Sequence, residues 1–89
     1  MVDSLIMPSD ALLDRITVNP AIFGGKPIVR GRRLAVEHVL GMLAHGDSAE
    51  TILVGYPWME SEDIRACLEY ARRLVAHERV ELHAASSGS

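Results

Sequence analysis

Residues 36–57, VEHVLGMLAHGDSAETILVGYP, contain two helical patterns separated by a short polar turn. In the first pattern, apolar residues recur at the spacings i, i+3, i+4, i+7 and i+8, which place them on one helix face. These residues are Val36, Val39, Leu40, Leu43 and Ala44. The pattern stops at His45 and Gly46, and glycine readily adopts the left-handed conformation that closes a helix. The sequence therefore predicts a helix over residues 36–45.

The second pattern begins directly after this turn. Asp47 and Glu50 have the spacing of a capping box, in which the first side chain accepts from the helix start and the second reaches back. The inward residues are Ile52, Leu53 and Tyr56. Pro57 cannot continue a helix, so we expect this helix to cover about residues 48–56. Two helices joined by a short glycine-containing turn are typical of a helix–turn–helix, although many helical hairpins that never touch DNA share the pattern.

A third helix is predicted from about Ser61 to about Glu78. Its apolar stripe consists of Ile64, Cys67, Leu68, Ala71, Leu74 and Val75. Residues 9–14 could form one further helical turn at the start of the chain. The helices therefore dominate the expected fold, which is mainly α.

Short extended segments are expected ahead of these helices. Residues 15–19 resemble a strand that ends at an Asn-Pro pair, and residues 27–30 and 33–36 resemble two extended pieces around a turn at Gly31. The predicted organisation is an N-terminal segment (1–14), one helix–turn–helix domain with its preceding β-strand or hairpin (15–78), and a flexible tail (79–89).

Charge is segregated along the chain, whose 89 residues carry a formal net charge of −3. Residues 15–33 contain five basic side chains and no acidic one, whereas residues 34–64 contain six acidic side chains and no basic one. The basic residues are Arg15, Lys26, Arg30, Arg32 and Arg33. Clustered arginines without interleaved acids are the usual footprint of contact with nucleic acid. The alternative is that they keep a turn soluble and pair with the acidic block.

Several classes of protein are disfavoured by composition. The N-terminus lacks the basic start and apolar run of a secretory signal, and no stretch has the roughly 20 apolar residues of a membrane helix. A single cysteine, Cys67, excludes an internal disulfide framework, and its apolar neighbours predict a buried structural thiol. We expect a cytoplasmic protein without a membrane partner.

No sequence feature indicates catalysis. The Gly24-Gly25-Lys26 segment lacks the upstream glycine and the following Ser or Thr of a phosphate loop, because Pro20 and Pro27 occupy those positions. His38 and His45 lie two turns apart on the predicted helix, too far to share a metal ion unaided. We therefore expect no enzyme activity, no metal site and no cofactor.

Binding is the remaining expectation. Lys26, Arg30, Arg32 and Arg33 are candidates for phosphate contacts, because guanidinium and ammonium groups suit anions. Ser48 and Thr51 are candidates for approaching base edges. The second predicted helix opposes deep insertion into a DNA groove, because it contains one acid and no base. Either the basic segment holds DNA, or the helical pair serves protein contacts.

The sequence also resembles a bacterial and archaeal family, domain-of-unknown-function family 433, over about residues 15–73. The matching motifs are Asn19-Pro20, Gly24-Gly25-Lys26-Pro27, Arg30-Gly31-x-Arg33, Gly46-Asp47-Ser48, Ile52, Tyr56-Pro57 and Glu62-Asp63-Ile64. Two residues depart from the pattern. Arg32 stands where threonine is common, and Glu60 stands where a capping threonine is usual, so Ser61 is expected to cap the third helix instead.

The resemblance implies a homeodomain-like helix–turn–helix and an antitoxin role of the VapB type. Such a protein would neutralise a PIN-like nuclease and bind its own operator DNA, with homodimers matching two half-sites and the strand at 15–19 pairing across chains. The alternative is a protein-interaction module that masks a nuclease without binding DNA. In this alternative an arginine near the end of the third helix could enter the acidic centre of the nuclease. The candidates are Arg72, Arg73 and Arg79.

Overall fold

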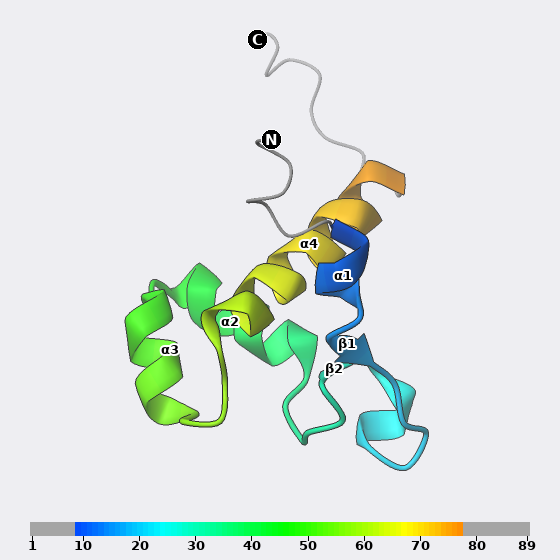
Figure 1. The fold of residues 1–89 in the computed structure, drawn as a ribbon, viewed down its shortest axis with the longest axis horizontal. Helices are drawn as coiled ribbons and strands as arrows, with labels where there is room; N and C mark the ends of the chain where they lie inside the picture. The colour runs from blue at the N-terminus through cyan, green and yellow to red at the C-terminus, as the bar shows by residue number, and fades with distance from the viewer. Residues whose placement is uncertain (1–8, 78–89) are drawn as a thin grey trace, which may run out of the picture.

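The computed structural model describes residues 9–77, which form four α-helices and a two-stranded antiparallel sheet (Figure 1). The helices are α1 (Ser9–Leu13), α2 (Val36–His45), α3 (Ala49–Gly55) and α4 (Ser61–His77). The strands are β1 (Ile16–Thr17) and β2 (Ile28–Val29), with the 3-10 turn η2 (Phe23–Gly25) between them. The prediction of a mainly helical fold with a short β element is confirmed. The predicted tail at 79–89, with Arg79, lies outside the described residues.

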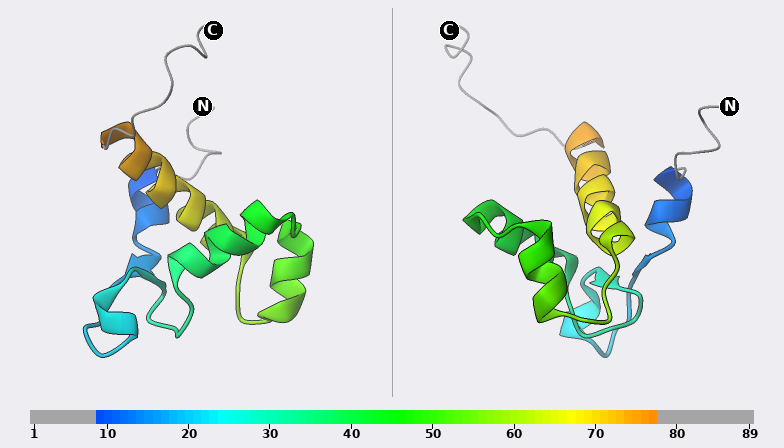
Figure 2. Two further views of the ribbon diagram at one scale, coloured as in Figure 1. Left: turned by 180° about the vertical axis from the view of Figure 1, so that it is seen from behind. Right: turned by 60° about the vertical axis from the view of Figure 1, so that its left-hand side comes forward.

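Helix α4 is the element against which the others pack. It contacts α1, α2, α3 and β1, and it lies between α1 and the α2–α3 pair in the views of Figures 1 and 2. Leu12 of α1 is buried, so part of the predicted N-terminal segment packs against α4. No helix within residues 9–77 is long and apolar enough to cross a membrane.

One hydrophobic core joins the hairpin, the helical pair and α4. Its buried members are Val29, Leu34, Val36, Val39, Ile52, Met59, Ile64 and Cys67. The inward faces predicted for the first two helices are confirmed for Val36, Val39 and Ile52, which are buried, but Ala44 is exposed. The apolar stripe predicted for α4 is wrong in its second half. The α2–α3 pair, the hairpin and α1 all pack on α4, yet Leu68, Leu74 and Val75 are exposed.

The β element is a hairpin within one chain. Ile16 pairs with Val29 and Thr17 pairs with Ile28, and an isolated bridge joins Ile28 to Ala35. The extended pieces predicted on both sides of Gly31 are therefore present, but the strand pair is β1–β2. This pairing lies within one chain. The predicted pairing of residues 15–19 with a second chain is a separate contact and stays a prediction.

The turn after β2 has an unusual backbone. Arg30 and Gly31 both have positive φ, at 45° and 70°, and the N–H of Arg32 donates to the carbonyl of Val29 at 2.8 Å. Two successive positive φ values suit tight hairpin turns and are normally left to Gly, Asn or Asp. An arginine in this conformation costs about 1 kcal/mol, so its side-chain contacts must offset the strain.

The turn between α2 and α3 differs from the predicted capping box. Gly46, at φ 111°, closes α2, and the N–H groups of Gly46 and Asp47 donate to the carbonyls of Leu43 and Met42. This is the hydrogen-bond pattern of a Schellman motif, in which Asp47 belongs to the end of α2. The N-cap of α3 is therefore Ser48, whose Oγ accepts from the N–H of Thr51 at 3.1 Å. The assignment of Asp47 as the cap is wrong.

The start of α4 also differs from the prediction. Ser61 is the first helical residue, but its hydroxyl donates to the carboxylate of Glu62 at 3.3 Å. The carboxylate of Asp63 instead accepts from the N–H of Glu60 at 2.8 Å. The predicted cap by Ser61 is wrong, because an acid in the first turn reaches back to the residue ahead of the helix.

Candidate functional site

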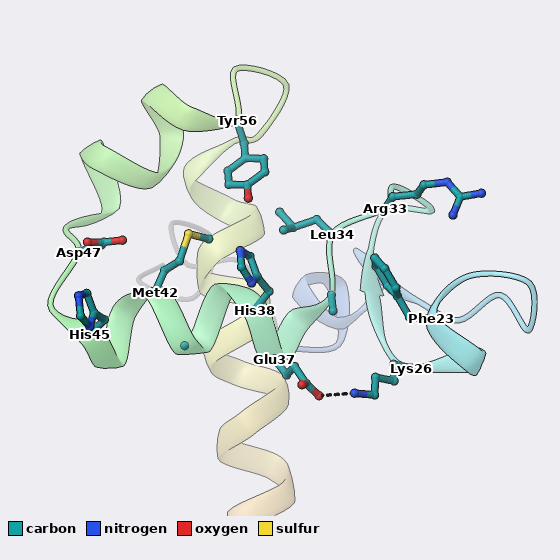
Figure 3. Close-up of a pocket in the computed structure, with 12 residues that line it drawn as sticks. Phe23, Lys26, Arg33, Leu34, Glu37, His38, Met42, His45, Asp47 and Tyr56 are labelled. Atoms are coloured by element: carbon teal, nitrogen blue, oxygen red, sulfur yellow. Dashed lines mark hydrogen bonds and ion pairs between the residues drawn. The ribbon is translucent and has the colours of Figure 1, made fainter.

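A groove of about 830 Å³ lies beside α2. Its walls come from η2, the turn after β2, the exposed side of α2 and the residue after α3 (Figure 3). Phe23 lies at one end, with Arg33 and Lys26 on either side of it, and His45 and Asp47 lie at the other end. The groove therefore brings together residues that are up to 33 positions apart in the sequence.

The two cations of the groove have different surroundings. Lys26 donates to the carboxylate of Glu37 at 3.1 Å, and both side chains are more than half exposed. An exposed ion pair of this kind contributes little stability. Arg33 is exposed, and its guanidinium forms no ion pair with any side chain of residues 9–77. Arg33 is therefore the more available cation of the two.

Phe23 forms the aromatic rim of the groove. Its side chain is 48% exposed, and its φ is 48°. A bulky residue with positive φ is strained by about 1 kcal/mol. The fold thus holds an aromatic ring in solvent at an energetic cost, and such strain often accompanies a functional site.

The middle of the groove combines an apolar floor with polar groups. Leu34 is buried and Met42 is half-buried. His38 of α2 and Tyr56, which follows α3, point toward one another across the groove (Figure 3). An imidazole and a phenol can both donate and accept hydrogen bonds, so the floor offers specific polar contacts to a ligand.

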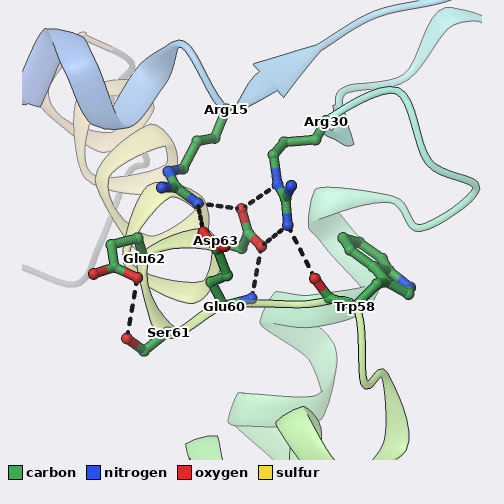
Figure 4. Close-up of polar contacts among 7 residues, drawn as sticks. All are labelled: Arg15, Arg30, Trp58, Glu60, Ser61, Glu62 and Asp63. Atoms are coloured by element: carbon green, nitrogen blue, oxygen red, sulfur yellow. Dashed lines mark hydrogen bonds and ion pairs between the residues drawn. The ribbon is translucent and has the colours of Figure 1, made fainter.

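A second polar centre lies at the start of α4 and is structural in character (Figure 4). The fully buried carboxylate of Asp63 accepts from Arg15 Nη1 at 2.9 Å and from Arg30 Nη2 and Nε at 2.7 and 2.9 Å. Arg30 also donates to the carbonyl of Trp58 at 3.1 Å, and Arg15 donates to Glu60 at 2.8 Å. This centre ties the hairpin to α4.

The charge state of Asp63 follows from these contacts. Burial by itself raises the pKa of a carboxyl group. The hydrogen bonds from Arg30, the Glu60 N–H and Arg15 outweigh the burial, and they hold the pKa of Asp63 below its ordinary value. Hydrogen bonds to the carboxylates of Glu60 and Asp63 raise the pKa of Arg15, and the hydrogen bonds to Asp63 raise the pKa of Arg30. The folded chain therefore contains an ionised carboxylate between two cations.

The family of the chain follows from comparison with known proteins. The profile of a family described as "Protein of unknown function (DUF433)" matches residues 16–71. The chain belongs to this family. The match spans β1 to the middle of α4, and it includes the hairpin, the helical pair and Asp63.

Two known proteins are similar to this DUF433 protein. "Uncharacterized protein y4eO" of Sinorhizobium fredii (strain NBRC 101917 / NGR234) is 41% identical over 56 residues, which are 63% of this chain and 25% of that protein. A crystal structure of a DUF433 member from Anabaena variabilis ATCC 29413 is 25% identical, with a TM-score of 0.65 over 81% of this chain and 71% of that chain. This chain thus spans about a quarter of the length of the curated relative.

The remaining predicted contact residues of the DUF433 protein are also engaged within the chain. The guanidinium of Arg32 lies 4.6 Å from the centre of the Trp58 ring, and that of Arg30 lies 5.5 Å from it. Cation–π contact is favourable at such distances. The hydroxyl of Ser48 lies 3.0 Å from that of Thr51. The roles of Trp58 and Asp63 were not predicted from the sequence. For Asp63 a signal was present, because an acid in the first turn of a helix is a possible partner for the arginines of residues 15–33.

Two of the arginines predicted to contact a nuclease, Arg72 and Arg73, pair with Glu69. Arg72 donates to both carboxylate oxygens, at 2.9 and 2.8 Å, and Arg73 donates to one at 3.0 Å. Hydrogen bonds from Arg72 and Arg73 lower the pKa of Glu69 to about 2. A carboxylate of a partner would therefore have to compete with Glu69 for these arginines.

The other candidates for chemistry are unremarkable in their surroundings. Cys67 is fully buried, as predicted, and burial, helped by the charge of Asp63, raises its pKa to about 12. Its thiol is therefore protonated at neutral pH. His38 is exposed and His45 is an exposed helix end. Residues 9–77 contain no group of three or more His, Cys, Asp or Glu side chains placed to hold a metal ion.

Replacing Asp63 by Asn tests the structural role of this centre. We expect Asp63→Asn to lower the free energy of unfolding by about 3 kcal/mol, the lower end of the cost of breaking a buried ion pair. The lower end applies because Arg15 and Arg30 remain 22% and 34% exposed and keep some water. Urea unfolding followed by circular dichroism measures the difference, and an unchanged midpoint would refute the role.

The same variant predicts a change in pH dependence. Because the folded pKa of Asp63 is lowered, its contribution is fully present above about pH 4, the range of an unfolded aspartate. Between the unfolded and the folded pKa, the unfolded chain binds more protons than the folded chain, so acid favours unfolding. The contribution of Asp63 is therefore lost as the pH falls through its folded pKa. The stability of Asp63→Asn should therefore fall less steeply with acid than that of the wild type. Glu69 titrates in both chains and cancels in the comparison.

Proposed function

We propose that this DUF433 protein is the antitoxin of a type II, VapBC-like toxin–antitoxin pair. It would bind a PIN-like nuclease and act as an autoregulator on operator DNA, with α2 and α3 serving as a homeodomain-like helix–turn–helix. The observation that carries the proposal is the uncovered apolar surface of α4. A small fold with a well-ordered core and exposed apolar side chains on one helix is suited to binding a macromolecule.

The apolar side chains of α4 are large and exposed. Leu68 is 48% exposed, Leu74 is 44% exposed and Val75 is 76% exposed. Leu68 and Val75 are seven residues apart and so lie on the same side of the helix, two turns from one another. This spacing suits insertion of both side chains into a hydrophobic groove of a partner.

The charged residues beside this surface favour an electrostatic component. Arg72 and Arg73 flank the apolar side chains, and Arg65 lies one turn before Leu68. An acidic nuclease surface would be attracted to these three arginines. The pairs with Glu69 make direct insertion of Arg72 or Arg73 into an acidic centre costly, so we assign the main contact to the apolar residues.

A double substitution in α4 tests the nuclease contact. The proposal requires a gene for a PIN-like nuclease next to this one. That gene would be expressed in a host with and without the DUF433 protein, and growth would be recorded. We expect wild type to restore growth and Leu68→Glu/Val75→Glu to fail, because burying two carboxylates in the interface costs several kcal/mol.

Val54→Glu provides the matched control. Val54 is 80% exposed on α3 and is thus comparable in exposure to Val75. It should leave neutralisation intact, and all variants should keep the wild-type circular dichroism spectrum. Rescue by the α4 double variant as complete as that by wild type would refute the proposed contact.

DNA binding would depend on fewer residues than the basic block contains. Arg30 donates to the buried Asp63, which leaves Arg32 and Arg33 of the turn as the main phosphate contacts. Lys26 could join them, because its ion pair with Glu37 is exposed and weak. Helix α3 carries Glu50 and no basic residue. A homodimer would double the number of phosphate contacts and match two half-sites.

The engagement of Arg15 and Arg30 by the buried Asp63 favours a second candidate function. In this alternative the protein masks its nuclease without binding DNA. The basic block then serves the fold, as the pairing of Arg15 and Arg30 with Asp63 suggests, and the acidic charge of α3 is no obstacle.

Salt-dependent retention of upstream DNA separates the two candidates. For the DNA-binding function, Arg33→Ala should weaken retention and lower the salt slope by about 1, the value for one lost phosphate contact. Arg65→Ala, an exposed arginine on α4, is the control and should change neither. No retention at low salt, or equal retention by wild type and Arg32→Ala/Arg33→Ala, would leave the protein-only module as the function.

A further inference from the structure

We propose that the groove beside α2 binds a nucleoside monophosphate, with the base on Phe23 and the phosphate on Arg33 and Lys26. This inference goes beyond the proposed antitoxin role, because neither nuclease masking nor operator binding needs a pocket for one nucleotide. It rests on the combination of an exposed aromatic ring, two cations at the same end and an apolar floor with polar side chains.

Phe23 supplies the stacking surface. Its ring lies at the rim of the groove and is 48% exposed, although packing it into the core would remove more apolar surface from water. The positive φ of Phe23 sets the direction of this side chain. Bases stack favourably on exposed aromatic rings, and any base can do so.

Arg33 and Lys26 supply the phosphate contacts. Both residues lie at the same end of the groove, on either side of Phe23 (Figure 3). Both side chains are exposed, and to share one phosphate the guanidinium of Arg33 would turn toward Lys26. A guanidinium can form two parallel hydrogen bonds to phosphate oxygens, and a lysine adds a point charge. The pair between Lys26 and Glu37 is exposed at both ends, so a phosphate can replace the carboxylate of Glu37 at little cost.

The rest of the groove favours one phosphate over several. Glu37 and Asp47 both line it, and their negative charges oppose additional phosphate groups. His38 and Tyr56 point into the middle, where they can hydrogen-bond to sugar hydroxyls or base edges. A volume of about 830 Å³ lies within the range of small-molecule sites. A monophosphate therefore suits the groove better than a triphosphate.

Such a ligand has two sources with the same chemistry. It can be a free mononucleotide, or it can be the phosphorylated 5′ nucleotide of a single strand. The negative charge of the whole chain, −3, favours a ligand that brings few phosphates.

Calorimetric titration of the full chain tests the proposal. The ligands are AMP, adenosine, inorganic phosphate and ATP. AMP should bind at least tenfold more tightly than adenosine or phosphate alone, since it uses both parts of the groove, and ATP should bind no more tightly than AMP.

A tetradeoxyadenylate with and without its 5′ phosphate distinguishes the sources. Equal binding of AMP and the phosphorylated strand indicates a strand end, and stronger binding of AMP indicates the free nucleotide.

Substitutions assign the two halves of the site. Phe23→Ala and Phe23→Leu should each weaken AMP about tenfold while leaving inorganic phosphate unchanged. Arg33→Ala should weaken AMP and phosphate but not adenosine. The controls are Val54→Ala for an exposed apolar side chain and Arg65→Ala for an exposed arginine, and both should bind AMP as wild type does.

Three results would overturn the proposal. The first is that AMP binds no more tightly than adenosine or phosphate. The second is that neither Phe23→Leu nor Arg33→Ala weakens AMP binding. The third is that wild type does not bind AMP while Phe23→Leu loses nuclease neutralisation. The last would assign the groove to the protein partner. Because the titration needs neither nuclease nor operator, its failure leaves the proposed antitoxin role standing, and failure of that role leaves the titration interpretable.

Discussion

The buried carboxylate of Asp63 is the contact that the rest of this DUF433 protein depends on. It accepts two hydrogen bonds from Arg30, one from Arg15 and one from the N–H of Glu60. These four hydrogen bonds fix the first turn of α4, the start of β1 and the turn after β2 at one point. They also offset the strain of an arginine with positive φ. The hairpin has only two residues in each strand, and so short a hairpin is not stable without such an attachment.

This centre also explains the segregated charges. The basic block is divided between two tasks, because Arg15 and Arg30 point to Asp63 while Arg33 and Lys26 line the groove. Arg32 lies over Trp58, next to the centre. Attachment of the hairpin thus holds Arg33 and Phe23 at the rim of the groove. The fold and the proposed binding site are physically coupled through one turn of the chain.

Local patterns predicted the helices well, because periodicity and helix-ending residues depend on near neighbours. The bounds of α2 and its buried residues followed from spacing and Gly46. The cap of α3 did not, since Asp47 is used by the Schellman motif that ends α2 and only Ser48 remains. The exposure of Leu68, Leu74 and Val75 could not be predicted, because an apolar stripe does not show how far its covering elements extend.

The site was predicted only in part, for a related reason. The sequence identified Lys26 and Arg33 as available cations, but also Arg30, whose partner is 33 residues away. Phe23, His38 and Tyr56 come from three separate segments, and only the fold brings them to one groove. Ion pairs and grooves between distant segments depend on tertiary packing, which charge counts along a sequence do not contain.

The central claim is that Arg30 belongs to the fold and Arg33 to the surface, and the unfolding free energies of Arg30→Ala and Arg33→Ala test it most directly. Both changes remove one arginine from the same turn. At position 30, the strain of a positive φ is about the same for alanine as for arginine, so the comparison reports the loss of side-chain contacts. The structure predicts a loss of at least about 2 kcal/mol for Arg30→Ala, which leaves a buried carboxylate short of partners. It predicts a change within about 0.5 kcal/mol for Arg33→Ala, as for most surface positions. Equal stability of the two variants would contradict the claim.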